Sequence, residues 1–200
     1  MSRKGLVLLD RDGVLNSMVM NPDHGTVDSP LHPDQVECFP WVPEALASLT
    51  RAGYGLAIVS NQPAAAKGKT TLSNLERVHQ RVLDLVQTSG GRILSSHLCF
   101  HRSEDGCRCR KPMTGLLESA IQANPGYVTS LSWMVGDGVT DVEAGARLSL
   151  LTAYLGPTKF DVLKIFEEKQ LQPTFRGSDL LQFAEHIREN SAIVRPENYQ

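Results

Sequence analysis

The fold is decided by residues 5–16, which read GLVLLDRDGVLN. The apolar run at 6–9 is too short for a helix, so it predicts a fully buried strand of a parallel sheet. Asp10 and Asp12 follow directly, and open parallel sheets place their ligands at this carboxyl end of a strand. Residues two apart in an extended segment point to the same side, so both carboxylates can face one substrate. An ordinary strand followed by an Asp/Gly turn is the alternative that this stretch alone leaves open.

The composition fits a single α/β domain. The chain has 200 residues, of which 41% are hydrophobic, and a net charge of −2 that favours neither nucleic acid nor anionic membrane as a partner. The amino-terminal residues do not resemble a signal peptide, and no apolar run approaches the roughly 20 residues that span a bilayer. We therefore expect one domain over residues 1–190 and a polar tail at 191–200, in a cytoplasmic monomer.

Two further strands are predicted to end in polar residues. The apolar run at 54–59 leads into Ser60 and Asn61, whose hydroxyl and backbone N–H can donate hydrogen bonds to phosphoryl oxygens. The run at 131–136 leads into Asp137, which is placed to complete the coordination shell of a cation. Asp141 follows at a predicted helix start, where it either bonds ordered water on the metal or caps the helix. Both interpretations of Asp141 remain open.

The other segments predict alternating helices and strands. Helices are expected over 43–53, from a capping box at 73–76, over 112–123 and after 178, with strands at 93–100 and 148–155. The segment 17–40 is rich in Pro, Asp, His and Gly and has neither periodicity. It predicts a long irregular loop that covers the site and helps to select the substrate. Within it, both His24 and His32 are expected to be solvated loop histidines, with a substrate contact as the alternative for each.

Three thiols and an imidazole crowd into residues 99–109. The predicted ligands of a tetrahedral zinc ion are Cys99, His101, Cys107 and Cys109. Four protein ligands leave no open position, so the expected role of the zinc is structural. His97 is the alternative to His101, unrelated buried cysteines are the alternative to a metal site, and Cys38 is read as a plain thiol.

A basic pair follows the predicted zinc loop. Zinc would hold this backbone rigid and so aim two long side chains. Lys111 can supply a point charge to a phosphate and to Asp10, and Arg110 can grip a second anionic or hydroxylated part of a substrate. A solvated basic pair at a helix start is the alternative, but it would oppose the helix dipole.

Together these strand ends predict phosphoryl transfer. Asp10 would attack phosphorus and form an aspartyl-phosphate, while Asp12 would protonate the leaving oxygen and then activate water. Mg²⁺ would be bound by the side chains of Asp10 and Asp137 and by the backbone carbonyl of Asp12. The phosphoryl oxygens would also be held by three protein groups: Ser60, Asn61 and Lys111.

Four motifs resemble those of the haloacid dehalogenase-like (HAD) phosphatases: DRDGVLN (10–16), SNQ (60–62), RKP (110–112) and VGDGVTD (135–141). With C-x-H-x₅-C-x-C at 99–109, the chain resembles the zinc-containing subgroup that acts on heptose 1,7-bisphosphate or histidinol phosphate. The resemblance covers about residues 5–156. It implies a Rossmann-like three-layer α/β/α fold with a central parallel sheet, a minimal cap and a zinc-binding loop, together with the cofactors Mg²⁺ and Zn²⁺.

The resemblance also implies a small phosphorylated sugar or metabolite as the substrate. The first expectation is hydrolysis of D-glycero-D-manno-heptose 1,7-bisphosphate to heptose 1-phosphate, and the alternatives are histidinol phosphate or another sugar phosphate. The positions implied to contact the substrate are Asn16, His24, Asn61, Gln62 and Arg110. The chain departs from the pattern in the loop before His24, in the loop after Gln62, and at Gly138, where the family often has Lys.

Two other classes of function are kept beside this one. The first is a zinc-stabilised binding module that has lost turnover, which would release no phosphate from any phosphorylated metabolite. The second is a phosphotransferase, which would use the same aspartyl-phosphate but pass the phosphoryl group to an added acceptor.

Overall fold

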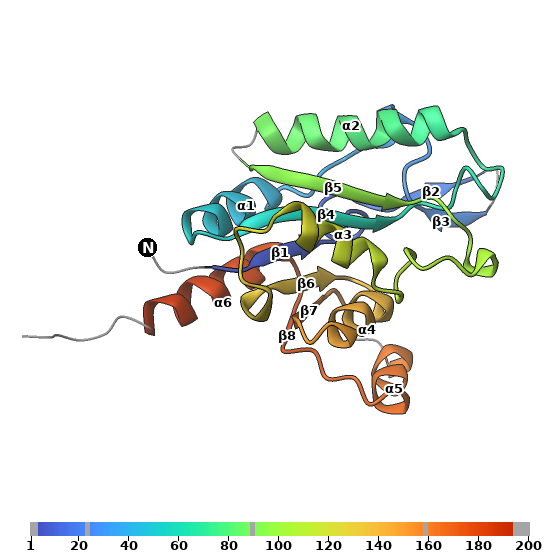
Figure 1. The fold of residues 1–200 in the computed structure, drawn as a ribbon. Helices are drawn as coiled ribbons and strands as arrows, with labels where there is room; N and C mark the ends of the chain where they lie inside the picture. The colour runs from blue at the N-terminus through green and yellow to red at the C-terminus, as the bar shows by residue number, and fades with distance from the viewer. Residues whose placement is uncertain (1–3, 23–24, 89–90, 158–159, 194–200) are drawn as a thin grey trace, which may run out of the picture.

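The computed structural model describes residues 4–22, 25–88, 91–157 and 160–193. Its centre is a six-stranded sheet in the order β5-β4-β1-β6-β7-β8 (Figure 1), and every neighbouring pair of strands is parallel. The strands are β1 (Leu6–Leu9), β4 (Gly55–Asn61), β5 (Ile93–Cys99), β6 (Trp133–Gly136), β7 (Leu151–Leu155) and β8 (Phe175–Gly177). The expected parallel α/β sheet is confirmed, and β1 lies near its middle.

Helices cover both faces of the sheet, which makes three layers (Figure 1). One face packs against α1 (Val42–Arg51), α2 (Leu72–Thr88) and α6 (Leu180–Ile193). The other face packs against α3 (Gly115–Ala123) and α4 (Val139–Arg147), and α5 (Phe160–Glu168) packs beside α4. This arrangement confirms the expected three-layer fold.

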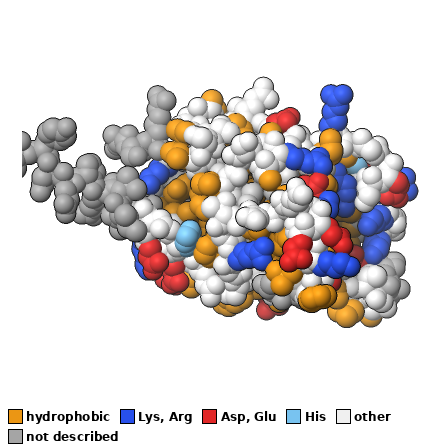
Figure 2. Space-filling model, turned by 90° about the horizontal axis from the view of Figure 1, so that it is seen from below, with side chains coloured by type: hydrophobic (Ala, Val, Ile, Leu, Met, Phe, Trp, Pro, Cys, Tyr) orange, Lys and Arg blue, Asp and Glu red, His pale blue; other side chains and the backbone are white. Residues whose placement is uncertain are grey.

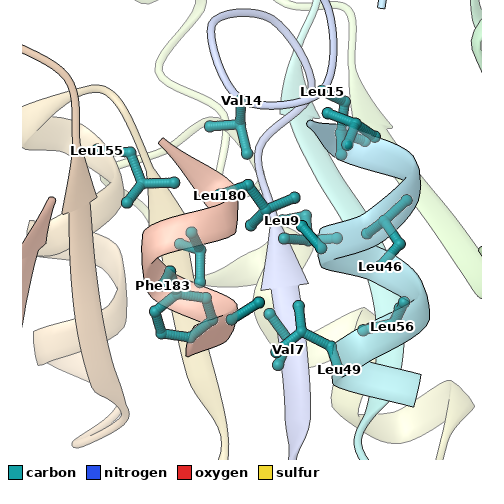
Figure 3. Close-up of a cluster of buried hydrophobic side chains, with 14 of the residues drawn as sticks. Val7, Leu9, Val14, Leu15, Leu46, Leu49, Leu56, Leu155, Leu180 and Phe183 are labelled. Carbon is teal, nitrogen blue, oxygen red and sulfur yellow. The ribbon is translucent and has the colours of Figure 1, made fainter. Parts of the chain in front are cut away.

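Strand β1 shows why a continuous apolar run was needed. Val7 and Leu9 belong to one core cluster, and Leu6 and Leu8 belong to the cluster on the opposite face. All four side chains are at most 1% exposed. Figure 3 shows Val7 and Leu9 between side chains of α1 and α6. Because successive side chains point to opposite faces, a strand covered on both faces has no position for a polar residue until it ends.

Two helices begin at other residues than the sequence predicted. The expected capping box at 73–76 is wrong: α2 begins at Leu72, and the hydroxyl of Thr71 accepts a hydrogen bond from the backbone N–H of Asn74. The helix expected from Pro112 begins at Gly115, because the chain first makes a turn in which the N–H of Met113 bonds to the carbonyl of Arg110. That turn places the Lys111 ammonium within hydrogen-bond distance of the carbonyl of Val59 in β4.

Other helices and strands also begin or end at residues that differ from the sequence prediction. Residues 129–131 form a 3₁₀ turn, so β6 starts at Trp133, and 148–150 complete the end of α4, so β7 starts at Leu151. Helix α6 runs to Ile193, which is beyond the expected domain end at 190. The remaining tail, 194–200, lies outside the described residues.

The segment 17–40 is more regular than expected. Strands β2 (Val19–Asn21) and β3 (Thr26–Asp28) pair in an antiparallel hairpin, and a 3₁₀ turn follows at Pro33–Gln35. Lys69 ties the hairpin to the loop after β4, since its ammonium lies 2.6 Å from a carboxylate oxygen of Asp28. Three-residue strands are too short to show an alternating pattern in the sequence, so composition alone suggested a loop.

The surface carries charges of both signs. On the face seen in Figure 2, Lys and Arg side chains are interspersed with Asp and Glu side chains. Some of these charges pair: Glu143 lies 2.6 Å from Arg147 and 2.7 Å from Lys169. Among the residues that the structure describes, no helix is long and apolar enough to cross a membrane.

Candidate active site

The predicted acidic residues meet at the carboxyl edge of the sheet. Asp10 follows β1 and Asp137 follows the neighbouring strand β6, while Ser60 lies near the end of β4 on the other side of β1. The N–H of Asp10 bonds to the carbonyl of Val135 at 2.8 Å, so the ladder between β1 and β6 continues up to the site. The parallel register therefore brings the two acids together from distant parts of the chain.

Lys111 is buried at the centre of this edge, with 2% of its surface exposed. Its ammonium lies 3.0 Å from Asp10 and 2.6 Å from Asp141, and it donates a hydrogen bond of 2.7 Å to the carbonyl of Val59. Burial alone lowers the pKa of Lys111, but Asp10 and Asp141 more than offset this and hold the pKa above its ordinary value. Lys111 is therefore a fixed positive charge beside Asp10, as the sequence predicted.

Three carboxylates form a cluster that suits a divalent cation. One oxygen from each of Asp10, Asp137 and Asp141 lies within 4.8 Å of the other two. Burial, followed by repulsion from Asp10 and Asp141, raises the pKa of Asp137 to about 7. Such crowded acids are relieved by a hard cation, and carboxylate oxygens are the ligands that Mg²⁺ prefers. The donor set therefore fits the predicted metal.

Asp141 caps a helix, as one of the two sequence interpretations has it, and it also belongs to the acidic cluster. One carboxylate oxygen accepts a hydrogen bond from the N–H of Gly138 at 3.0 Å, which caps the start of α4. The other oxygen contacts Lys111, and the carboxylate belongs to the acidic cluster. Burial raises the pKa of Asp141 to about 6, with Lys111 opposing the rise.

Glycine is required where the motif loops approach one another. A Cβ atom on Gly13 would lie 2.0 Å from a carboxylate oxygen of Asp137, and Gly13 has a φ of +84°. A Cβ atom on Gly136 would lie 2.3 Å from the carboxyl carbon of Asp141. Any side chain at either position would displace a carboxylate of the cluster.

The Asp12 carboxylate has a different set of partners. It accepts hydrogen bonds from Arg11 (3.0 to 3.2 Å), from Asn16 (2.8 Å) and from Gln62 (2.5 Å). Burial alone raises the pKa of Asp12, but Arg11, Asn16 and Gln62 together lower it below its ordinary value. In this conformation the side chain of Asp12 is held as a carboxylate beside the acidic cluster rather than within it.

Two predicted substrate contacts lie in the interior. Asn16 is 0% exposed and Gln62 is 1% exposed, and both side chains bond to Asp12. Arg11, which is also 0% exposed, was missed because it stands at the variable position of D-x-D. The sequence did offer one signal for Arg11: it stands between two acids at the end of a predicted buried strand. The predicted contact His24 lies outside the described residues.

The other predicted contacts line a cavity next to Lys111, with a volume of about 360 Å³. Asn61 and Lys111 are joined by reciprocal hydrogen bonds of 3.0 and 3.1 Å between the Asn61 amide and the Lys111 backbone. Arg110 lines the same cavity, and its guanidinium donates to the carbonyl of His101 at 3.4 Å. Arg102, Ser103 and Thr140, which sequence reasoning did not select, also line this cavity.

The predicted zinc ligands converge. The three sulfur atoms of Cys99, Cys107 and Cys109 lie 3.3 to 3.7 Å apart, and Nδ1 of His101 lies 3.6 Å from the sulfur of Cys99 and 3.3 Å from that of Cys109. Zn–S bonds of about 2.3 Å in a tetrahedron need ligand atoms separated by a little under 4 Å. His97, the alternative ligand, instead lies 3.1 Å from the hydroxyl of Ser95. The donor set and its spacing therefore fit zinc.

The thiols perturb one another in ways that a metal would relieve. Burial, with the neighbouring Cys109, raises the pKa of Cys99 to about 12. Cys107, which accepts hydrogen bonds from backbone N–H groups and from the other thiols, has its pKa lowered to about 7. Zinc binds thiolates and would stabilise the ionised form of every sulfur.

Comparisons with known proteins agree with this geometry. The sequence profile of the family described as polynucleotide kinase 3 phosphatase matches residues 15–199. A D-glycero-beta-D-manno-heptose-1,7-bisphosphate 7-phosphatase from Pseudomonas aeruginosa is 38% identical over 147 residues, which cover 70% of this chain and 75% of that protein. A histidine biosynthesis bifunctional protein HisB from Legionella pneumophila is 34% identical over 147 residues, but these cover only 40% of that protein.

A solved structure extends the likeness to nearly the whole chain. The structure of D,D-heptose 1,7-bisphosphate phosphatase from B. bronchiseptica, in complex with magnesium and phosphate, has a TM-score of 0.75 to this chain. The two sequences are 26% identical, and the match covers 94% of this chain and 99% of that one.

Proposed function

Because the chain belongs to the polynucleotide kinase 3 phosphatase family, within the HAD-like phosphatases, we propose that it hydrolyses a small phosphorylated sugar through an aspartyl-phosphate on Asp10. The observation that carries the proposal is the position of Asp10 at the end of β1. There its carboxylate lies against the buried ammonium of Lys111 and within the cluster formed with Asp137 and Asp141. An ionised carboxylate is the form that acts as a nucleophile.

The reaction proceeds in two steps. In the first, Asp12 acts in its protonated form, having taken a proton from solvent: a carboxylate oxygen of Asp10 forms a bond to phosphorus while the bond to the sugar oxygen breaks, and the leaving oxygen takes that proton from Asp12. In the second, Asp12 removes a proton from water, the water oxygen bonds to phosphorus, and Asp10 is released with inorganic phosphate. The partners that lower the pKa of Asp12 favour the form that acts in the second step.

The remaining groups stabilise charge on the phosphoryl oxygens. Lys111 supplies a fixed positive charge, and Ser60 and Asn61 at the end of β4 supply donors. Mg²⁺ held by Asp10, by Asp137 and by the backbone carbonyl of Asp12 would neutralise the charge that develops on the transferred group. Zinc held by Cys99, His101, Cys107 and Cys109 would fix the loop that precedes Arg110 and Lys111.

For the substrate, we propose heptose 1,7-bisphosphate hydrolysed at the 7-phosphate. The P. aeruginosa relative carries this activity in its name, and the cavity beside Lys111 is lined by Arg110, whose guanidinium suits a second phosphate. Asn61 lines the same cavity. Asn16 and Gln62 instead act through Asp12, to which both side chains donate hydrogen bonds. His24 remains a proposed substrate contact. The test is phosphate release with Mg²⁺ from each anomer of the bisphosphate and from histidinol phosphate. Preference for histidinol phosphate would contradict the sugar assignment.

Substitution of the nucleophile tests the mechanism. Asp10→Asn should lower phosphate release by at least about a thousand-fold, as expected for loss of a covalent nucleophile, while the zinc content stays unchanged. Glu168→Gln alters an exposed acid at the end of α5, outside the site, and serves as the control. Turnover by Asp10→Asn equal to that of the control would contradict the aspartyl-phosphate. Phosphate found on an added acceptor rather than in solution would indicate a phosphotransferase.

A further inference from the structure

The side chain of Gln62 connects two groups of the proposed reaction. Gln62 follows the end of β4 and is 1% exposed. Its backbone N–H donates to the carbonyl of Cys99 at 2.6 Å, which anchors the residue to the end of the neighbouring strand β5. Gln62 is therefore held at both its backbone and its side chain, and it does not line the cavity beside Lys111.

The partners of the Gln62 amide fix its orientation. Its oxygen accepts a hydrogen bond from Arg11 at 2.7 Å, and a guanidinium can only donate. Its nitrogen donates to Asp12 at 2.5 Å, and an ionised carboxylate can only accept. If the amide were flipped, its nitrogen would face the Arg11 guanidinium, donor against donor, and its oxygen would face the Asp12 carboxylate, acceptor against acceptor. Only one orientation of the amide therefore satisfies both contacts.

This orientation determines the state of the Ser60 hydroxyl. The nitrogen of Gln62 also lies 3.0 Å from the hydroxyl oxygen of Ser60 and donates its second hydrogen to it. Ser60, which is 1% exposed, therefore accepts from Gln62, and its own hydrogen is left to donate to another group. In the proposed reaction, that group would be a phosphoryl oxygen of the substrate.

We propose that Gln62 is a positioning residue that sets the Asp12 carboxylate and the Ser60 hydroxyl at the same time. The inference rests on the proposed phosphatase function and differs from the sequence expectation that Gln62 contacts substrate. Arg11 supports this arrangement, because its guanidinium donates hydrogen bonds both to the Gln62 amide and to Asp12. Gln62 thereby couples the acid/base group to a donor that stabilises the phosphoryl oxygens.

The dependence of the rate on the leaving group tests this role. The value of kcat/KM reports the steps up to the departure of the leaving group, which is where Asp12 gives up its proton. Sugar and simple alkyl phosphates have basic leaving oxygens that need this proton, whereas p-nitrophenyl phosphate does not. The experiment measures kcat/KM for one sugar phosphate, one unbranched alkyl phosphate and p-nitrophenyl phosphate with Mg²⁺.

Two substitutions remove the amide donor in different ways. Gln62→Met keeps the approximate shape and removes both polar groups. Gln62→Glu keeps the acceptor for Arg11 but replaces the amide donor to Asp12 and Ser60 with a carboxylate, which also places a second negative charge beside Asp12. Each should lower kcat/KM for the sugar and alkyl phosphates by about a hundred-fold, which is the lower range for a general acid. The loss with p-nitrophenyl phosphate should be smaller than with the other two esters, because the Ser60 hydroxyl is kept and only its orientation is freed.

Thr70→Val is the matched control. Thr70 lies in the same loop as Gln62, and its hydroxyl donates to the carbonyl of Leu31 and accepts from the amide of Asn74. The substitution removes these two bonds and touches neither Asp12 nor Ser60, so all three rates should stay unchanged. Far-UV circular dichroism identifies any variant that fails to fold, and the other variant then decides.

Three outcomes would overturn the inference. An equal loss with all three esters in a folded variant would mean a purely structural role. A loss confined to the sugar phosphate would make Gln62 a substrate-reading residue. Wild-type protein that releases no phosphate from any of the esters would instead overturn the proposed function, and the inference with it.

Discussion

At the scale of single residues, the buried histidine of α2 links stability to pH. His79 is largely buried, and neither ring nitrogen has a hydrogen-bond partner among the described residues. Burial, followed by repulsion from Arg11, lowers its pKa from 6.5 to about 4. The folded protein therefore resists protonation of a group that the unfolded chain protonates readily.

The sign of the effect follows from linkage. Because the folded pKa is depressed, the stabilising contribution is complete above pH 6.5 and is lost as the pH falls from there toward 4. His79→Leu should remove up to about 2 kcal/mol of the decrease in unfolding free energy between pH 7 and pH 5. Urea unfolding at both pH values measures it, and His32→Leu, at an exposed position, is the control. Identical pH slopes for His79→Leu and wild type would contradict the buried neutral imidazole.

The same scale shows which site residues a sequence can reveal. Asp10, Lys111 and Asp137 were predictable, because charged residues at the ends of buried strands have few structural reasons to be there. The polar residues around Asp12 were recognised as part of the site, but the groups that their side chains contact were not. A sequence pattern does not say whether a side chain faces a cavity or a neighbouring carboxylate. Asn16 and Gln62 were therefore assigned to the substrate, although both lie against Asp12.

At the scale of helices and strands, the start of α2 offers a test of the corrected cap. Thr71→Ala removes the hydroxyl that accepts from the N–H of Asn74 and should lower the unfolding free energy by about 1 kcal/mol. Ser73→Ala changes a residue inside the helix and should alter it by less than about 0.5 kcal/mol. Thermal or urea unfolding compares the two, and a larger effect at Ser73 would restore the capping box that the sequence suggested.

The loop at 99–109 should depend on its metal. Cys107→Ala removes one of the four predicted zinc ligands and should abolish stoichiometric zinc and lower the melting temperature and solubility. Elemental analysis and thermal unfolding measure both effects. Cys38→Ala removes a thiol outside the cluster and should keep the zinc. A Cys107→Ala protein with full activity and stability would rule out a structural role.

Elements were predictable where burial imposes a long pattern and were missed where it does not. The central strands and α1 were recognised from uninterrupted or periodic apolar residues. The hairpin of β2 and β3 has three residues in each strand and depends on tertiary contacts such as the one between Lys69 and Asp28. Such contacts leave no local signal in the sequence.

At the scale of the whole molecule, the last helix is part of the central core. Phe183 of α6 is fully buried and packs edge-on against Trp133 of β6 and Phe175 of β8, with ring centroids 5.1 and 5.7 Å away. Phe183→Ala should lower the unfolding free energy by about 3–5 kcal/mol, whereas Phe160→Ala, at a side chain that is 84% exposed, should have little effect. Urea unfolding followed by fluorescence and circular dichroism measures both variants. Similar stabilities would mean that α6 is not part of the cooperative unit.

The strand order also has a consequence for protein synthesis. Strand β1 lies between β4, which is made soon after it, and β6, which is made only after the zinc loop has been completed. On the ribosome, a nascent chain can therefore pair β1 with β4, and expose the predicted zinc ligands at 99–109, before Asp137 has emerged. The emerging polypeptide then carries Asp10 without its cluster partners Asp137 and Asp141, so under the proposed function it would stay inactive until β6 and the start of α4 have left the exit tunnel.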